Sequence, residues 1–251
     1  MLGAVLTIAL AATSWQWQLD SPPPPPFLPV GTYDVDGFDT PAATVRALHA
    51  QGTTVVCYLS AGTWERWRPD ARRFPRRVIG RRVAGWPGER WLDVRAFRGR
   101  LGTLLERRLD MCRRKGFDAV EPDNVDGFEN RTGFALRAHD QLAFNRWLAR
   151  AAHRRGLAVL LKNDADQARR LEPRFDGALV EQCIRYRECA KYRPFARAGK
   201  PVFAVEYRRA CPRHPPPWLD LMLKRLRLDA WRVPCPTGSV SRAPRARPPT
   251  R

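Results

Sequence analysis

The sequence predicts an α/β protein built as a single-domain (β/α)8 (TIM) barrel. Three observations favour this fold. The chain has 251 residues, of which 44% are hydrophobic, and α/β barrels often have this length. Apolar runs with strand character alternate along the chain with helical stretches, which is the pattern of repeated β/α units. No GxGxxG motif follows a predicted strand, and this disfavours the alternative of a doubly wound sheet.

Eight strands are expected, each an apolar run with strand character. They occupy residues 15–19, 32–36, 54–60, 119–123, 158–163, 178–181, 202–207 and, with the weakest pattern, 230–233. Six helices are expected at residues 41–51, 95–115, 139–155, 166–171, 194–198 and 217–226. Pro41 suits the first position of the first helix, and Gly116 and Gly156 suit the ends of the second and third.

The barrel is expected to occupy residues 15–235. Residues 1–14 resemble a secretion leader, which is atypical because no basic residues precede its apolar run, and which is too short to span a bilayer. Residues 236–251 are rich in Pro, Arg and Ser, so we expect a disordered basic tail. Five prolines at 22–26 are interpreted as a stiff loop within the domain rather than as a linker. We expect a secreted or extracytoplasmic monomer without a membrane span.

The chain carries 45 Lys and Arg residues against 25 Asp and Glu, a formal charge of +20. Almost all of the cations are arginines, which favours a coding bias over a designed basic patch. The electric field of a protein with this net charge attracts polyanions without specificity. No nucleic-acid motif or run of interleaved aromatic and basic residues is present, so we expect no specific nucleic-acid partner. A polyanion-binding protein remains the least favoured alternative.

The six cysteines form an even set without a CxxC pair, which argues against a zinc knuckle or a thioredoxin motif. In an exported protein they predict up to three disulfides, for which fifteen pairings are possible. The shortest loops favour Cys183–Cys189 and Cys211–Cys235, which leaves Cys57 for Cys112. The alternative is six buried free thiols in a reducing compartment.

Carboxylates gather where the predicted strands end, and (β/α)8 enzymes carry their active sites at that end of the barrel. They are Asp34, Asp36, Asp39, Glu121, Asp123, Asp126, Asp164, Glu181 and Glu206. Such a ring can bind a hard divalent cation, bind a cationic ligand, or supply the acid and base that hydrolyse a glycosidic bond.

Metal and serine chemistry have little support. The run 123–127 resembles a calcium loop but lacks an oxygen ligand at its third position, and the four histidines are isolated. Ser60 lacks the first glycine of a GxSxG elbow. We therefore expect no metal and no cofactor.

Two carboxylates on different strands remain as the natural pair for glycoside chemistry. By position, Asp123 and Glu181 are the best candidates, with Glu206 third. The alternative is that each carboxylate is structural and is paired with arginines or backbone donors.

Several motifs resemble glycoside hydrolase family 114, the endo-α-1,4-polygalactosaminidases. The resemblance covers roughly residues 15 to 235, in the runs WQWQL (15–19), YDVDGFDT (33–40), VCYLSAG (56–62), RPD (68–70), GWPGERWLDVR (85–95), GFDAVEPDNVD (116–126), LKND (161–164), EQCIRYREC (181–189) and GKPVFAVEY (199–207). The five prolines of the first loop depart from the family pattern and are expected to reshape one subsite.

The resemblance implies a (β/α)8 endo-hydrolase that cleaves α-1,4-linked galactosamine-rich polysaccharide with retention. It implies Asp123 as the nucleophile and Glu181 as the acid/base. The positions implied to line sugar subsites are Asp36, Asp39, Asn124, Asp126, Lys162, Asn163, Glu206 and Tyr207, and those expected to stack on sugars are Tyr58 and Trp17, the latter with a core role as an equal alternative. Galactosamine units are ammonium cations near neutral pH, which an acidic cavity binds through charge-assisted hydrogen bonds. A carbohydrate-binding barrel without turnover is the alternative function.

Overall fold

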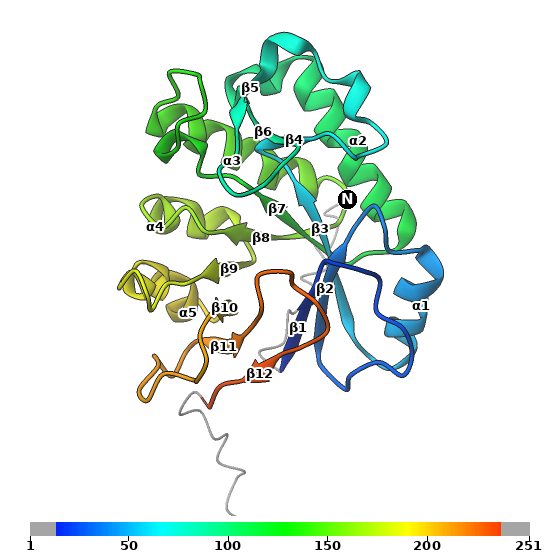
Figure 1. Ribbon diagram of the computed structural model, residues 1–251, viewed down its shortest axis with the longest axis vertical. Coiled ribbons are helices and arrows are strands. Elements are labelled where there is room, and N and C mark those ends of the chain that lie inside the picture. Colours follow the sequence, from blue (N-terminus) through cyan, green and yellow to red (C-terminus); the bar gives the residue numbers. More distant parts are fainter. Residues whose placement is uncertain (1–13, 237–251) are drawn as a thin grey trace, which may run out of the picture.

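A computed structural model describes residues 14–236 of the chain (Figure 1). The predicted leader and basic tail therefore lie outside the described residues, apart from Ser14 and Pro236. No helix in the described part is long and apolar enough to cross a membrane.

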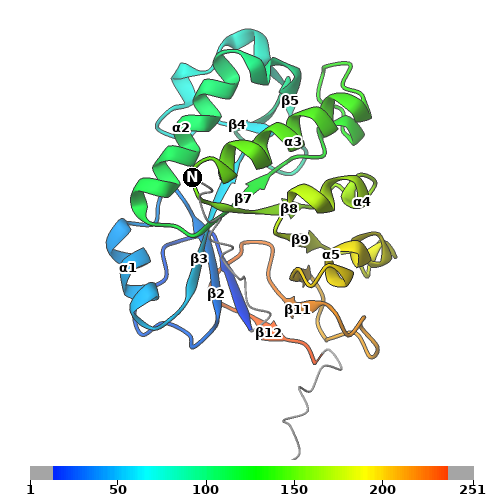
Figure 2. The same ribbon diagram turned by 180° about the vertical axis from the view of Figure 1, so that it is seen from behind.

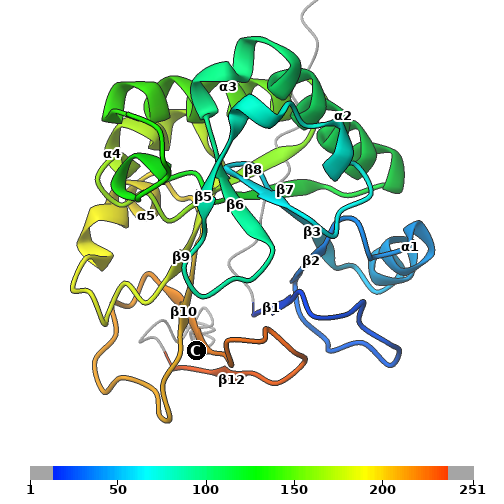
Figure 3. The same cartoon turned by 45° about the horizontal axis from the view of Figure 1, so that its top comes forward.

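A nine-stranded sheet forms the centre of the molecule and confirms the predicted barrel fold. Its strands follow the order β1-β2-β3-β7-β8-β9-β10-β11-β12. The bounds are Trp15–Gln18 for β1, Thr32–Asp36 for β2, Thr54–Ser60 for β3, Ala119–Asp123 for β7, Ala158–Lys162 for β8, Gly177–Glu181 for β9, Val202–Glu206 for β10, Asp220–Leu223 for β11 and Val233–Pro234 for β12. The first eight strands in this order run parallel, and only β12 is antiparallel to its neighbour. Figure 3 shows them arranged around a curve.

The eighth parallel strand lies where the sequence pattern predicted a helix. Residues 217–226 contain β11 instead, and the expected strand at 230–233 is replaced by the short antiparallel β12. The cause is burial on both faces, because Leu221 and Leu223 belong to the outer core while Met222 belongs to the barrel interior. A strand buried on both sides has no polar face, so its periodicity does not separate it from a helix.

Side chains and a loop close the barrel between its first and last parallel strands. Trp15 Nε1 of β1 donates a hydrogen bond to the carbonyl of Asp220 in β11 at 2.9 Å. The buried Lys224 Nζ donates to Gln16 Oε1 at 3.2 Å, and the amide of Leu19 donates to the carbonyl of Leu228 at 2.9 Å. The loop after β11 therefore stands where a strand ladder would otherwise complete the cylinder.

Helices cover the outside of the sheet (Figure 2). They are α1 (Ala42–Ala50), α2 (Arg100–Lys115), α3 (Ala138–His153), α4 (Ala168–Leu171) and α5 (Arg193–Arg197). The predicted helix at 95–115 is divided into a short 3-10 turn, Val94–Arg98, and α2. Gly116 ends α2 with φ of 93°, a left-handed conformation that suits glycine.

A small antiparallel sheet, absent from the sequence-based expectations, is inserted between β3 and α2. It consists of β4 (Thr63–Glu65), β6 (Glu89–Leu92) and β5 (Ile79–Arg82), in that order. Leu92 donates its amide to the carbonyl of Gly62, which joins the insert to the end of β3. The insert thus lies at the carboxyl end of the barrel strands, where β5 and β6 can be followed in Figure 3.

Three disulfides tie the described chain together, with the pairing that the shortest loops favoured. Cys57–Cys112 joins β3 to α2, whereas the other two, Cys183–Cys189 and Cys211–Cys235, close shorter loops. Gly37 lies directly against the first bridge, and a β-carbon there would come within 2.3 Å of Cys57 Sγ. The glycine therefore makes room for the long-range cross-link.

The Cys57→Ala/Cys112→Ala variant is expected to lower the free energy of unfolding by about 4 kcal/mol, because this bridge spans 55 residues. The Cys183→Ala/Cys189→Ala variant removes a bridge that spans only 6 residues, so the expected loss is about 2 kcal/mol. Denaturant unfolding of both variants and the parent measures the difference. Equal losses would contradict the loop-length argument.

Candidate active site

A buried lysine connects three carboxylates from the two strands on either side of its own, β7 and β9. Lys162, at the end of β8, places its Nζ 2.9 Å from Glu121 Oε1, 3.1 Å from Asp123 Oδ1 and 3.2 Å from Glu181 Oε2. Burial by itself would lower the pKa of Lys162, but these three carboxylates raise it well above its usual range. Lys162 therefore remains a cation and holds the strand ends together.

Asp123 is oriented by four hydrogen bonds at the end of β7. Its Oδ1 accepts from the amide of Asn124 at 2.7 Å and from Lys162 Nζ, while Oδ2 accepts from Tyr58 at 3.1 Å and from Asn124 Nδ2 at 3.3 Å. Burial and the neighbouring Asp123 raise the pKa of Tyr58 well above its usual range, so its hydroxyl stays a donor. Gly62 lets the backbone after Asp123 pass close by, because a β-carbon on Gly62 would lie 1.7 Å from the carbonyl oxygen of Asn124.

Glu181 lies at the end of β9 and is fixed from two further strands. The hydroxyl of Tyr207, which follows β10, donates a hydrogen bond to Glu181 Oε1. The side-chain oxygen of Asn163, which follows β8, accepts a hydrogen bond from the Glu181 amide at 2.9 Å. The side chains of Asp123 and Glu181 are 19% and 26% exposed, so both remain open to a ligand.

Two further acids lie beneath this pair, inside the barrel. Burial raises the pKa of Glu121 to about 7 and that of Asp34 well above its usual range. Trp17 donates its ring N–H to Glu121 Oε2 at 3.0 Å, and Lys162 Nζ lies 4.6 Å from a Trp17 ring centroid. Trp17 is only 1% exposed and belongs to the interior core of the barrel, and it also forms part of the lining of the cavity above this core.

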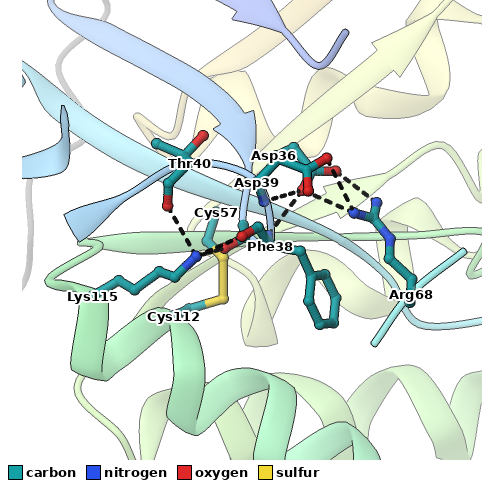
Figure 4. Close-up of a disulfide and its surroundings, with 9 residues drawn as sticks. Asp36, Phe38, Asp39, Thr40, Cys57, Arg68, Cys112 and Lys115 are labelled. Carbon is teal, nitrogen blue, oxygen red and sulfur yellow. Dashed lines mark hydrogen bonds and ion pairs between the residues drawn. A yellow bond between two sulfur atoms is a disulfide. The ribbon is translucent and has the colours of Figure 1, made fainter. Parts of the chain in front are cut away.

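The β2–α1 loop brings Asp36 and Asp39 to the same end of the barrel. Arg68 holds the Asp36 carboxylate through two hydrogen bonds of 2.9 and 2.6 Å. On the other side of the loop, Lys115 Nζ donates to the carbonyls of Gly37, Phe38 and Thr40 at 2.7 to 2.9 Å. Figure 4 shows Lys115 reaching this loop beside the Cys57–Cys112 bridge. The loop is therefore clamped, while the Asp39 side chain stays 67% exposed.

Glu206 does not reach the cavity, contrary to the expectation that it lines a sugar subsite. It is buried at the end of β10, where its Oε1 accepts the amide of Ile184 at 2.8 Å. The carboxylate thus supports the loop after β9. The other predicted sugar-binding positions, including Asp126, all line the cavity.

The cavity at this end of the barrel has a volume of about 480 Å³. Eight carboxylates and three cationic side chains line it, although the whole chain has a formal charge of +20. The carboxylates are Asp20, Asp36, Asp39, Glu65, Glu89, Asp123, Asp126 and Glu181, and the cations are Arg68, Lys162 and Arg227. The site is thus strongly acidic within a basic protein.

Sequence reasoning missed the contribution of the inserted small sheet. Glu65 and Glu89 line the cavity, and burial raises the pKa of both, that of Glu65 to about 7. Trp67 and Trp86 also line it, and they are 53% and 52% exposed. Exposed aromatic rings beside an acidic cavity provide flat faces for sugar rings. The signal in the sequence was the long interval between the third and fourth predicted strands.

Comparisons with known proteins agree with this geometry. The profile of glycoside-hydrolase family GH114 matches residues 4–240. An uncharacterised protein from Deinococcus radiodurans is 28% identical over an alignment of 221 residues that covers 76% of this chain and 68% of that protein. The crystal structure of Ega3 from Aspergillus fumigatus in complex with galactosamine has a TM-score of 0.83 and 33% identity, covering 89% of this chain and 95% of that one. The glycoside hydrolase domain of PelA from Pseudomonas aeruginosa shares the fold, with a TM-score of 0.68, 17% identity, and coverage of 88% and 98%.

Proposed function

Because the chain belongs to glycoside-hydrolase family GH114, we propose that it is a secreted, endo-acting, retaining hydrolase of α-1,4-linked galactosamine-rich polysaccharide. Asp123 is the nucleophile and Glu181 the acid/base, the roles that the family motifs imply for these positions.

The observation that carries this proposal is the shared contact with Lys162. Asp123 Oδ1 and Glu181 Oε2 both lie within 3.2 Å of Lys162 Nζ, so these two oxygens are separated by no more than twice that distance. Retaining glycosidases place their carboxyl groups about 5 to 5.5 Å apart, whereas inverting enzymes need about 6.5 to 9.5 Å to admit a water molecule. This upper limit on one oxygen pair is compatible with the shorter spacing, and so with the retention that the family resemblance implies.

In the first step, Asp123 attacks the anomeric carbon while Glu181 donates a proton to the departing glycosidic oxygen. In the second step, Glu181 removes a proton from water, which displaces Asp123 from the sugar. Tyr207 and Lys162 hold Glu181 in place through both steps. Lys162 also keeps a positive charge between the two carboxylates, which limits their mutual repulsion.

The substrate class follows from the charge of the cavity. Eight lining carboxylates suit a polymer whose units carry ammonium groups, and Ega3, a relative at 33% identity, was solved with galactosamine. The exposed Trp67 and Trp86 suit binding of several units within a chain, which supports endo-cleavage. Secretion is supported by the three disulfides, since such bonds persist in oxidising compartments. The proposal includes a leader in residues 1–14, a catalytic domain in 15–235 and a basic tail in 236–251.

Digestion of partly deacetylated α-1,4-galactosamine polymer tests the proposal. We expect mass spectrometry to find short oligomers early in the reaction, and NMR to find the newly formed reducing ends in the α configuration first. Early β products would contradict retention. Binding of the polymer without any cleavage by the folded protein would instead support a carbohydrate-binding barrel.

A further inference from the structure

A second cavity of about 250 Å³ adjoins the first on the side of Glu181. The two cavities share the lining residues Asp126, Asn163, Glu181 and Gln182. The second one extends past Glu181 to the loops that follow β7, β8 and β9. The two cavities therefore lie side by side, with Glu181 lining both.

Asp164 is the most unusual group in this second cavity. The residue is 1% exposed, and its Oδ2 accepts a hydrogen bond from Asn145 Nδ2 at 2.8 Å. Its Oδ1 has no hydrogen-bond partner among residues 14–236, although it is buried. Burial and the neighbouring Asp126 and Glu129 raise the pKa of Asp164 to about 8. A buried carboxyl oxygen without a donor is costly unless a ligand supplies one.

The remaining lining is acidic as well. Asp126, Glu129, Glu181 and Glu188 line the cavity together with Asp164, and its lining in the described residues includes no lysine or arginine. Lys191 lies beside the cavity, with its Nζ 2.5 Å from Asp166 and 3.8 Å from Glu188, so it offsets part of the negative charge of Glu188. No group of three His, Cys, Asp or Glu side chains in residues 14–236 has an arrangement that would hold a metal ion. The cavity therefore suits an organic cation.

Tyr186 provides an aromatic face at the edge of this cavity. It lines the cavity and is 60% exposed. The Cys183–Cys189 disulfide closes the loop that carries Tyr186 and Glu188. At the start of this loop, the carboxylate of Glu206 accepts a hydrogen bond from the amide of Ile184. The loop is thus held in one conformation, so that the ring and the carboxylate keep their places.

We propose that this second cavity is a further sugar subsite, in which Asp164 Oδ1 accepts a hydrogen bond from the ammonium group of a neighbouring galactosamine unit while Tyr186 contacts its ring. Glu188 and Glu129 add to the negative potential around the same group. This inference rests on the proposed function, because it places the next unit of the same polymer beyond the acid/base carboxylate.

Binding to an inactive parent tests the inference without turnover. In the Asp123→Asn background, calorimetry would measure the Kd of an α-1,4-galactosamine hexamer and of its fully N-acetylated counterpart. Asp164→Asn and, separately, Glu188→Gln should weaken binding of the amine hexamer about tenfold. A bound ammonium group favours the ionised form of Asp164 despite its raised pKa, so each substitution removes a negative acceptor from the complex. The Kd of the acetylated hexamer should change less than about twofold, since it carries no ammonium groups.

Glu106→Gln is the matched control, because Glu106 is an α2 surface glutamate that pairs with Arg154 at 2.9 Å and lines neither cavity. It should leave both Kd values unchanged. The subsite is refuted if Asp164→Asn and Glu188→Gln bind the amine hexamer as the parent does, or if they weaken both hexamers equally. Cleavage by the wild-type enzyme reports separately on the proposed function, so a failure of the subsite alone leaves cleavage intact.

Discussion

Asp123→Asn is expected to abolish cleavage, with kcat lowered by about 10⁴-fold or more, because an amide oxygen cannot replace a carboxylate as the nucleophile. The fold should be retained, since the asparagine side-chain oxygen can still accept a hydrogen bond from Lys162, while its NH2 group, in the place of Oδ2, can donate to the hydroxyl oxygen of Tyr58. Glu181→Gln should also lose activity, since the glutamine amide can neither donate a proton to the leaving oxygen nor accept one from water. Thermal unfolding and rates on an aryl oligogalactosaminide would measure both effects.

A small external nucleophile separates the two roles. With Asp123→Ala, azide can attack the anomeric carbon directly from the side that the carboxylate occupied, which gives a β-azide. With Glu181→Ala, azide attacks the sugar bound to Asp123 and gives an α-azide. The opposite assignment of anomers would exchange the roles of the two carboxylates, and no rescue of either variant would contradict the covalent mechanism.

Lys162→Met is expected to damage both catalysis and stability. It leaves Glu121, Asp123 and Glu181 without their shared cation, so kcat should fall by about a hundred- to thousandfold. The free energy of unfolding should fall by about 3 to 5 kcal/mol, which is typical for removing one partner of a buried ion pair. Denaturant unfolding and initial rates measure the two losses.

The pH dependence of that variant gives a further check. Burial already raises the pKa of Glu121 to about 7 beside Lys162, and losing the lysine raises it further. A carboxyl with a raised pKa in the folded state destabilises the protein as the pH increases above its unfolded value of about 4. The stability deficit of Lys162→Met should therefore be smaller at pH 5 than at pH 8.

Lys200→Met is the matched control for Lys162→Met. Lys200 is partly exposed, pairs with Glu172 at 2.8 Å and lies before β10, at the opposite end of the barrel strands from the cavity. Its loss should cost about 1 kcal/mol or less and leave kcat unchanged. A similar effect of both substitutions would show that Lys162 has no special place in the site.

Most of the barrel could be predicted because its strands have clear local patterns. The segments Thr32–Asp36, Thr54–Ser60 and Ala119–Asp123 were predicted with the bounds that the structure shows. The eighth strand was missed, because Asp220–Leu223 is buried on both faces and resembles part of a helix. The inserted sheet was also missed, since its short, irregular strands carry little periodicity.

The candidate site, like the fold, was predicted in part. Strand ends predicted which carboxylates gather at one end of the barrel, and the motifs predicted Asp123 and Glu181. They did not predict that Lys162 contacts both, that Glu206 turns away to hold the loop after β9, or that Asp164 keeps a free buried oxygen. Those facts depend on side-chain direction, which neighbours from distant strands decide.

By itself, therefore, the sequence determined the fold class, the family and the end of the barrel that carries the chemistry, because each depends on local patterns along the chain. Only the tertiary structure decided that Glu65 and Glu89 of the inserted sheet join this acidic end in a protein of charge +20, and that a second cavity lies beside Glu181. The physical reason is distance. Net charge sums over the whole chain, whereas a bound sugar responds to groups within about a Debye length, ~8 Å at physiological salt.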